Sequence, residues 1–452
     1  MLYHCTDVWE IIHMTKATKY EEMIGVFTPF PLEGENYDEF YVNTSQIRSV
    51  MNASNNIINT FLYSPNPTMK VLFMGHKGCG KSTEIMNISR HLQNRYEIIN
   101  FSIAQEVELS GIQYIDVIFA IMGQVIDYLT KQTALKVDEG ILDKLVNYWR
   151  GEEIFEKVVT DQMEMETGAQ AKLSLLQKIS VYGKGILKAG AESKKTIRNT
   201  VEPKISYLIS MINEIISDMN AQLKHECGKE ILVIIEDLDK LDIEDARHIF
   251  VSHRKTLLSL AMKMIIAFPI YMVYTADFAM IRDDFDSCVL YSMIKVQNSD
   301  RSRNEEGIDI LNQIVYKRME RNLIKEDALD FMVSKSGGAI RDLFYMLKEA
   351  ALYKLSQFDM NGQTGMEPIS MDEAKIVCSA LKSIYERNIT SKEQFDKLVE
   401  IYHDPQPENT DEVLSELLKS LSVIEYNGER WCGVHPVLVD FLKEKNKLRE
   451  DE

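Results

Sequence analysis

Short apolar runs alternate with longer stretches of helical periodicity over the first two thirds of the chain. The runs predict five buried strands, at residues 70–75, 96–103, 231–239, within 262–275 and at 291–296. Helical patterns occur at 47–62 and 82–93. Strands that are apolar throughout and separated by helices are typical of a parallel sheet covered on both faces. We therefore expect an α/β fold built on a five-stranded parallel sheet.

One connection is longer than a crossover helix requires. Residues at about 135–227, between the second and third predicted strands, are charged and mostly helical in pattern. Residues 168–190 are ambiguous, because alternate positions are apolar as in a strand while the flanks suit a helix. We expect a helical insertion with a solvated lysine face; the alternative is a surface for a membrane or a partner protein. The lysines of this face are Lys172, Lys178, Lys184 and Lys188.

The last third of the chain is predominantly helical in pattern. It predicts a helical lid at 307–358, a linker at 357–370 and a C-terminal domain at 371–452. In that domain the dipeptide Asn427-Gly428 separates two apolar runs, which is a strong signal for a β-hairpin. Helices followed by one hairpin predict a small winged-helix-like domain. The remaining residues form a preamble at 1–69 and a core at 70–306.

Composition adds limits to this picture. The 452 residues are 45% hydrophobic and 27% charged, as in an ordinary globular protein. A net charge of −18 restricts any DNA binding to a local basic patch. The six cysteines are scattered and lack zinc-site spacing, which indicates reduced thiols. With no signal peptide and no apolar run long enough to span a membrane, we expect a cytoplasmic protein.

The segment GHKGCGKST at 75–83 carries the first candidate chemistry. It fits the G-x-x-x-x-G-K-S pattern, between a predicted strand and a predicted helix, that wraps phosphate groups. Loop N–H groups and the helix N-terminus form an anion site there. Lys81 should reach the β- and γ-phosphates and the Ser82 hydroxyl should bind Mg²⁺, while His76 is expected at the surface. The predicted nucleotide-binding residues are Gly75, Gly78, Gly80, Lys81, Ser82 and Thr83.

The strand predicted at 231–239 ends in acids. Glu236 and Asp237 lie at its carboxyl end, where open α/β sheets bind ligands. One acid can hold the water shell of Mg²⁺ and the other can orient an attacking water. These two carboxylates are therefore the predicted metal-side and catalytic acids.

Two further candidates are single residues. Thr275, at the predicted tip of the fourth strand, could bond the γ-phosphate or the attacking water, or could simply end the strand. In SGGAIRD, Arg341 opens a helix after a glycine pair and could reach phosphate oxygens. The alternative for Arg341 is a solvated arginine behind a helix cap.

In this order, GHKGCGKST, IIEDLDKL, VYTADF and SGGAIRDLFYML resemble the Walker A, Walker B, sensor 1 and sensor 2 elements of AAA+ ATPases. The branch they resemble most is the origin-recognition-like group with its STAND-related bacterial members, over about residues 40–360. The resemblance implies ATP and Mg²⁺ as cofactors. The roles it implies fall on Lys81 and Ser82 (phosphate and metal), Glu236 (metal-side acid), Asp237 (water-activating acid), Thr275 (sensor 1) and Arg341 (sensor 2).

The same resemblance implies a regulatory ATPase whose nucleotide state gates homo-oligomerisation or engagement of an effector protein. Bacterial relatives often serve in antiphage defence or signalling, which is an analogy of fold only. AAA+ motors usually end Walker B in Asp-Glu, and the Glu-Asp order here predicts slow turnover.

Two other functions stay open at this point. One is a DNA-binding initiator or loader, which the acidic C-terminal region disfavours. The other is a nucleotide-binding scaffold with little hydrolysis. The sequence does not single out an arginine finger among Arg282, Arg301, Arg303 and Arg318.

Overall fold

The computed structural model describes most of the chain. The described residues are 3–4, 13–48, 52–131, 135–136, 138–149, 185–188, 190–361, 367–406, 411–426 and 431–448. Most of the ambiguous stretch at 168–190, with Lys172, Lys178 and Lys184, lies outside them, as does the predicted turn at Asn427 and Gly428. Lys188 is exposed in a short helical piece at 185–188.

A parallel sheet forms the centre of the molecule, which confirms the expected α/β class. Its strand order is β1-β3-β4-β5-β2-β6, and all neighbouring pairs are parallel. All residues of β2 and β5 are buried, which is why these strands are apolar apart from Lys70 and Lys263 at their first positions. The strands are β1 (Tyr3–His4), β2 (Lys70–Met74), β3 (Tyr96–Ser102), β4 (Glu230–Glu236), β5 (Lys263–Phe268) and β6 (Ser287–Leu290). The sheet thus has one strand more than predicted, because β1 adds to the edge strand β3.

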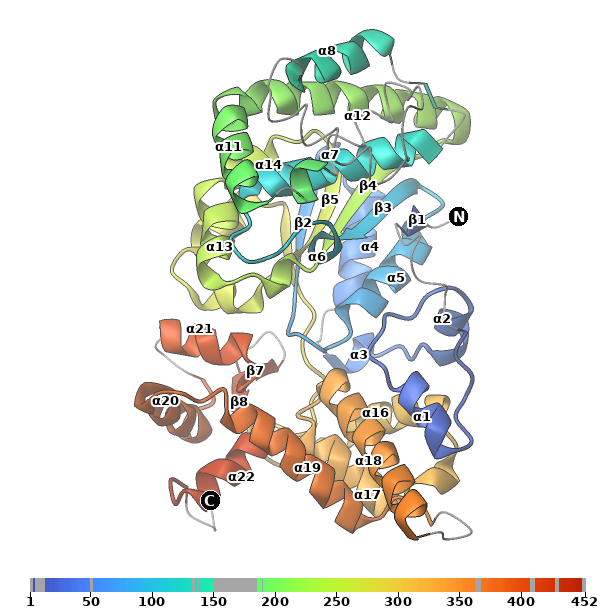
Figure 1. Ribbon diagram of the computed structural model, residues 1–452, viewed down its shortest axis with the longest axis vertical. Coiled ribbons are helices and arrows are strands. Elements are labelled where there is room, and N and C mark those ends of the chain that lie inside the picture. Colours follow the sequence, from blue (N-terminus) through green and yellow to red (C-terminus); the bar gives the residue numbers. More distant parts are fainter. Residues whose placement is uncertain are drawn as a thin grey trace.

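Helices cover both faces of the sheet (Figure 1). Helices α4 (Ala53–Tyr63) and α5 (Lys81–Leu92) pack together on one side. On the other side lie α7 (Tyr114–Lys131), which contacts β3, and α12 (Ile205–Cys227), which contacts β4. The helix predicted at 47–62 is instead two: α3 (Ser45–Arg48) precedes α4, whose N-terminus is capped by the side chain of Asn52.

The insertion is helical over its described residues. The described part includes α8 (Glu139–Trp149), α11 (Ala191–Val201), the short η1 (Glu202–Lys204) and α12, and it lies at one end of the molecule (Figure 1). Arg198 of α11 pairs with the buried Asp116 of α7 at 2.5 Å. This ion pair fixes the insertion to the helix that packs on the sheet.

The fourth strand is shorter than predicted. β5 stops at Phe268, because Pro269 has no N–H to donate to a strand ladder. A 3₁₀-helix, η4 (Ile270–Tyr274), follows, so Thr275 ends that helix and not a strand. The prediction that Thr275 stands at a strand tip is therefore wrong.

The fifth strand is displaced towards the N-terminus. β6 spans Ser287–Leu290, whereas 291–296 was predicted. Its partner β2 ends at Met74, whose carbonyl still accepts the Tyr291 N–H at 2.8 Å. Beyond this bond there is no strand to pair with, and the chain leaves the sheet.

The lid consists of α16 (Glu305–Arg318), α17 (Glu326–Lys335) and α18 (Ile340–Asn361) on the side of the sheet opposite the insertion (Figure 1). Part of the N-terminal preamble belongs to it: α1 (Tyr20–Val26) packs against α18. The Tyr20 hydroxyl donates to the carbonyl oxygens of Leu323 at 3.1 Å and Glu367 at 2.8 Å. α18 continues past residue 357, where the linker was predicted to begin.

The C-terminal region packs on the lid through α19 (Met371–Glu386), which contacts both α17 and α18. Strands β7 (Val423–Tyr426) and β8 (Trp431–Val434) form an antiparallel pair, which confirms the predicted hairpin. The other helices here are α20 (Lys392–His403), α21 (Glu412–Lys419) and α22 (Pro436–Glu444). The remaining short elements are α2 (Gly34–Phe40), α6 (Ile103–Glu106), η2 (Leu238–Lys240), α13 (Ile243–Arg247), η3 (His248–Ser252), α14 (Arg254–Leu258), α15 (Phe278–Asp284) and η5 (Arg321–Leu323).

The described residues also give the state of the cysteines and the character of the helices. The five cysteines found there are all free thiols. None of the helices in this part of the chain has both the length and the apolar character of a membrane span.

The junction between α17 and α18 depends on Gly338, and we predict that Gly338→Ala destabilises the protein strongly. Gly338 has a φ of +85°, and a Cβ there would lie 1.8 Å from the carbonyl oxygen of Ile294. An alanine in a left-handed conformation costs roughly 1–2 kcal/mol, and overpacking typically adds about 1–3 kcal/mol. The midpoint of thermal unfolding, followed by circular dichroism, should fall accordingly.

Gly228→Ala is the matched control, since Gly228 has a φ of +72° but no atom within 4 Å of its Cβ position. Gly228→Ala should bear only the cost of a left-handed alanine backbone, and it should lower the unfolding midpoint roughly half as much as Gly338→Ala does. Equal losses in the two variants would show that the contact with Ile294 does not matter.

Candidate nucleotide-binding site

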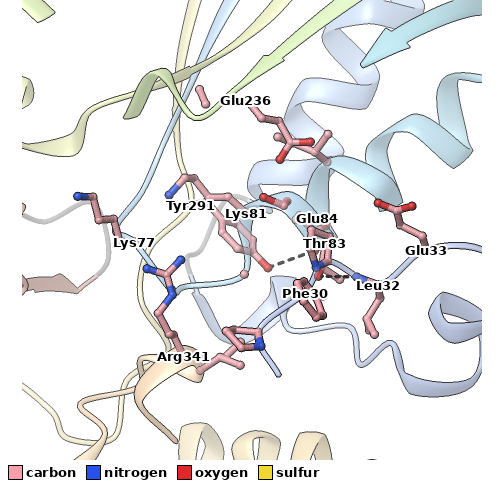
Figure 2. A pocket seen from close by; sticks show the side chains of 18 of the residues that line it. Phe30, Leu32, Glu33, Lys77, Lys81, Thr83, Glu84, Glu236, Tyr291 and Arg341 are labelled. Carbon is pink, nitrogen blue, oxygen red and sulfur yellow. Dashed lines mark hydrogen bonds between the residues drawn. The ribbon is translucent and has the colours of Figure 1, made fainter. Parts of the chain in front are cut away.

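A cavity of about 330 Å³ lies where the sheet, the lid and residues 29–48, here called the N-terminal segment, meet. This size is within the range of small-molecule sites, about 300–1,000 Å³. Figure 2 shows Glu236 and Arg341 on different sides of Lys81, with Phe30 and Leu32 on the wall formed by the N-terminal segment. Of the predicted site residues, the cavity brings together Gly78, Gly80, Lys81, Ser82, Thr83, Glu236, Asp237 and Arg341.

The loop between β2 and α5 is packed against the start of α18. Gly78 has a φ of +77°, and a Cβ there would lie 2.8 Å from the Cβ of Arg341. The Arg341 N–H donates to the Gly78 carbonyl at 3.3 Å. Gly75 opens the loop just behind the cavity lining, with its Cβ position 2.7 Å from the carbonyl oxygen of Tyr291. The lid arginine and the glycine loop therefore form one continuous surface.

Lys81 is buried and fully bonded. Its Nζ donates to the carbonyl oxygens of Gly75 at 2.7 Å and His76 at 2.8 Å, and it pairs with Oδ2 of Asp239 at 2.8 Å. Burial lowers the pKa of Lys81, but the charge and hydrogen bond of the Asp239 carboxylate, together with Cys79, raise the pKa above its usual value. An ammonium has three N–H donors, so all are engaged. A phosphate group would replace the acceptor that resembles it in charge, the Asp239 carboxylate.

Asp239 was not among the predicted site residues. It lies on η2, three residues beyond Glu236, and is buried within the cavity wall. Its position in an acid-rich stretch was the only signal in the sequence. The pairing with Lys81 depends on how the loops after β2 and β4 approach each other.

Glu236 and Asp237 are each held by the end of the neighbouring strand β3. Asn100 donates to Glu236 at 2.9 Å, and the Ser102 hydroxyl donates to Asp237 at 2.7 Å. Asp237 also pairs with Lys240 at 2.7 Å and has a φ of +71°, a left-handed conformation that is costly outside glycine and is often found at functional sites. The sequence offers no sign of the two β3 contacts, because they follow from the β3–β4 register.

The oxygen atoms around the cavity suit Mg²⁺ brought in with a nucleotide. The Ser82 hydroxyl and the carboxylates of Glu236, Asp237 and Asp239 line one cavity, and hard cations prefer such oxygen ligands. Among the described residues there is no group of three or more His, Cys, Asp and Glu that could hold a metal unaided. Mg²⁺ is commonly bound by one or two carboxylates together with phosphates and waters, so this donor set fits. Ser82 and Glu236 remain the predicted ligands.

Thr275 does not line the cavity. Its hydroxyl donates to the Met272 carbonyl at 2.8 Å, within the turn that ends η4. The residue of β5 that reaches the cavity wall is Ala267, which has no polar group to offer. The sensor 1 position expected for Thr275 is therefore not formed by this residue.

The four arginines that the sequence could not rank as an arginine finger differ in their positions relative to the cavity. Arg282 is largely exposed beside Asp283, Arg303 pairs with Asp330 and Glu305, and Arg301 donates to the Tyr402 carbonyl. Arg318, by contrast, lines the cavity and is only 6% exposed.

The N-terminal segment supports the loop from the side. Arg48 donates to the carbonyl oxygens of Cys79 at 2.7 Å and Ser292 at 2.5 Å, and its guanidinium lies 4.0 Å from the ring centre of Tyr291. The Tyr291 hydroxyl donates to the buried Glu84 at 3.1 Å (Figure 2). No motif marks these residues in the sequence, because they support the loop through contacts with residues far away in the chain.

His76 connects the loop to the C-terminal region. It is 1% exposed, so the expectation of a surface residue is wrong. Its Nε2 accepts the N–H of Glu425 on β7 at 2.8 Å, which requires the neutral ring. Burial, helped by the charge of Lys81, lowers the pKa of His76 to about 3.

A glycine loop that wraps a buried lysine, opposite acids at the end of a neighbouring parallel strand, defines a P-loop nucleotide-binding protein. Comparison with family models agrees: residues 50–276, just over half of the chain, match the KAP family P-loop domain. This chain belongs to the KAP family of P-loop NTPases. A search of curated proteins found no match.

Solved structures give a loose likeness to Cdc6 and ORC proteins. Cdc6p from Pyrobaculum aerophilum has a TM-score of 0.40 at 11% identity, covering 93% of this chain and 98% of that one. ORC1 from Aeropyrum pernix, solved in complex with DNA, has a TM-score of 0.38 at 9% identity, covering 93% and 96%. ORC2 from the same organism, with ADPNP and ADP, has a TM-score of 0.33 at 10% identity, covering 85% and 82%. Likeness at this level says nothing about ligands or partners here.

We predict that His76 makes the protein less stable as the pH falls. A folded-state pKa of about 3, below the value of 6.5 for a free histidine, means that the unfolded chain binds the proton more readily. The stabilisation is complete above pH ~6.5 and is lost as the pH falls towards 3, by up to about 1.4 kcal/mol per pH unit. Thermal unfolding between pH 7 and 5 should show this loss.

His76→Gln is the control, because the glutamine oxygen can accept the Glu425 N–H without titrating. Its unfolding midpoint should change less over the same pH range. Parallel pH profiles for the two proteins would contradict the neutral, buried state of His76.

Proposed function

We propose that this protein is a regulatory ATPase in which ATP binding to the cavity gates homo-oligomerisation or engagement of a partner protein. The observation that supports this is the direct bond between the phosphate-binding loop and the C-terminal hairpin, from the Glu425 N–H to His76. The His76 carbonyl also accepts a hydrogen bond from Nζ of Lys81, the residue expected at the phosphates. A change at Lys81 thus has a short path to the C-terminal region.

A second set of contacts joins the C-terminal region to the segment that follows the acids of β4. Lys419 of α21 pairs with Asp242, and Glu412 of the same helix pairs with Arg247 at 3.2 Å. These residues begin three positions after Asp239. The glycine loop and the segment after β4 therefore both contact the C-terminal region, and either could transmit the nucleotide state.

The residues would act together as follows. Loop N–H groups and Lys81 bind the phosphates of ATP, while Ser82 and Glu236 hold Mg²⁺, which neutralises charge on the phosphates when bound. Asp237 orients the attacking water and Arg341 reaches the phosphates from the lid. Both oxygens of Asp237 already accept bonds, from Ser102 and Lys240, which leaves them less free to take up a proton. Slow turnover follows from this arrangement.

We further propose that the C-terminal region is a winged-helix-like domain of the kind found in STAND-type switches, and that it binds protein and not DNA. Lys382 and Lys335 pair with Glu444 and Asp440 of α22, so these lysines present little free positive charge. A duplex-binding surface requires the opposite. The role in antiphage defence that the resemblance implies gains no support from these contacts and is left as an analogy.

The test is ATP turnover measured together with mass by light scattering. Wild type should hydrolyse slowly and form a larger species only with ATP. Lys81→Ala should lose both, with turnover reduced about 100-fold or more. Asp237→Ala should bind ATP, lose turnover and stay assembled, because water activation is removed and phosphate binding is not.

Thr275→Val serves as the control, since Thr275 lies away from the cavity. It should hydrolyse and assemble like wild type. A wild-type protein that binds ATP but neither hydrolyses it nor changes mass would refute the gate and leave a nucleotide-binding scaffold.

We also predict that Asp239→Asn increases the stabilisation by ATP. Without nucleotide the variant should unfold at a lower temperature, because breaking a buried ion pair typically costs about 3–5 kcal/mol. ATP without Mg²⁺ should then raise its unfolding midpoint more than that of wild type, since a phosphate replaces the missing partner of Lys81. Thermal shift measures both effects.

Asp242→Asn is the comparison, because Asp242 is exposed and pairs with Lys419 outside the loop. It should change neither midpoint appreciably. A smaller ATP shift in Asp239→Asn than in wild type would show that Asp239 assists nucleotide binding and does not compete with it.

A further inference from the structure

One part of the cavity wall is apolar and aromatic. We call it the base wall and define it by Phe30, Leu32, Phe40, Ile314, Arg318 and Phe344. Phe30 is 54% exposed at the cavity, although it is a large apolar side chain. The phosphate-binding groups Lys81, Glu236 and Asp237 belong to the loops after β2 and β4, whereas the base wall is built by the N-terminal segment and the lid.

Arg318 is the one cation of the base wall, and most of its hydrogen-bond donors have no partner among the described residues. The only hydrogen bond from its side chain to the described residues runs from Nη1 to the Ile314 carbonyl at 3.0 Å. Its Nε is buried without a partner, and no carboxylate of the described residues pairs with the guanidinium. Burial lowers the pKa of Arg318 to about 10. Buried charges are normally paired, so such a group calls for an explanation.

Arg48 shows how the same fold treats a buried arginine with a structural role. It is 2% exposed, and its Nε, Nη1 and Nη2 donate to Thr44, Ser292 and Cys79. Arg318 is almost as buried at 6% but has aromatic neighbours, with ring centres of Phe344 and Phe40 at 5.0 and 5.9 Å from its guanidinium carbon. The contrast indicates that Arg318 is not a structural brace, and Nη2, which donates to none of the described residues and is not among the buried unpaired atoms, is the donor left for a ligand.

The chemistry of the base wall suits a nucleobase. Proteins hold unpaired bases by stacking on aromatic rings and by hydrogen bonds to the base edge. A guanidinium offers only donors, and the ring nitrogens of adenine at positions 1, 3 and 7 are acceptors. We propose that Arg318 donates a hydrogen bond to a ring nitrogen of adenine and thereby recognises the base of the bound nucleotide. This rests on the proposed function, in which ATP occupies the cavity.

The first test compares ATP with inorganic tripolyphosphate, which has no base, by titration calorimetry on the full-length protein. Arg318→Met should bind ATP about tenfold or more weakly than wild type, as expected for losing a hydrogen bond from a charged group. Its affinity for tripolyphosphate should be unchanged. Lys81→Ala should weaken both ligands.

These outcomes keep the two proposals apart. A wild type that binds neither ATP nor tripolyphosphate overturns the proposed function, and the base proposal with it. A wild type that binds both, together with an Arg318→Met variant of unchanged ATP affinity, overturns the base proposal alone.

The second test uses 1-deaza-, 3-deaza- and 7-deaza-ATP, each of which lacks one ring acceptor. Wild type should bind one of the three about tenfold more weakly than ATP. Arg318→Met should bind that analogue and ATP equally, because the missing bond is the same one. If wild type binds all three as tightly as ATP, Arg318 does not contact a ring nitrogen.

Thermal unfolding without nucleotide is the control that shows whether each variant is still folded. Arg318→Met should unfold at the same or a higher temperature than wild type, since an unpaired buried charge is removed and the apolar volume is kept. Arg48→Met should unfold at a lower temperature, because three backbone and hydroxyl acceptors lose their donor. A loss in Arg318→Met as large as that in Arg48→Met would show a structural role and contradict the proposal.

Discussion

The ion pair between Lys81 and Asp239 is the interaction on which the site depends. It joins the loop after β2 to the loop after β4, two strands that are separated in the sheet by β5. Because the pair is buried, the cost of removing two charges from water has to be offset by close geometry and further bonds, here the carbonyl oxygens of Gly75 and His76. The lysine and the acid therefore fix the width of the phosphate site.

Around this pair, three distant parts of the chain contact the glycine loop. The N-terminal segment supplies Arg48, which bonds the loop carbonyl of Cys79; the lid supplies Arg341, packed on Gly78; and the C-terminal hairpin bonds His76. Each part contacts the loop through its backbone or through a buried polar group. A ligand that moves the loop must therefore alter contacts with all three, which is the physical basis of the switch proposed above.

Buried charges divide the cavity by function. At the end with the glycine loop the cation Lys81 pairs with the Asp239 carboxylate, the partner that a phosphate replaces in the proposed function. At the base wall Arg318 is surrounded by aromatic rings and keeps an unpaired nitrogen. A cation with a carboxylate partner suits an anionic ligand, whereas a cation among rings suits a flat, neutral one. The same residue type, arginine, serves as a brace at position 48 because all three of its nitrogens are bonded there.

The amino-acid sequence by itself determined the parallel sheet, the helical insertion over its described part, the hairpin and the residues of the glycine loop. These features follow from local patterns: continuous apolar runs, helical spacing, and glycines ahead of a lysine. It also placed Glu236 and Asp237 near that loop, because the carboxyl ends of parallel strands share one edge, and it offered Arg341 as a candidate from the glycine pair ahead of a helix. The apolar pattern failed at Thr275, since Pro269 ends β5 early. It also misplaced β6, since no property of a hydrophobic run marks where the partner strand β2 stops.

Only the tertiary structure decided the partners of these residues. Asp239 meets Lys81, Ser102 meets Asp237, and Arg318 enters the cavity through contacts between elements far apart in the chain. Such contacts depend on strand register and on how the lid packs on the N-terminal segment, and neither leaves a periodic trace in the sequence. The burial that lowers the pKa values of His76 and Arg318 arises in the same way, because it is a property of the assembled core and not of any single segment.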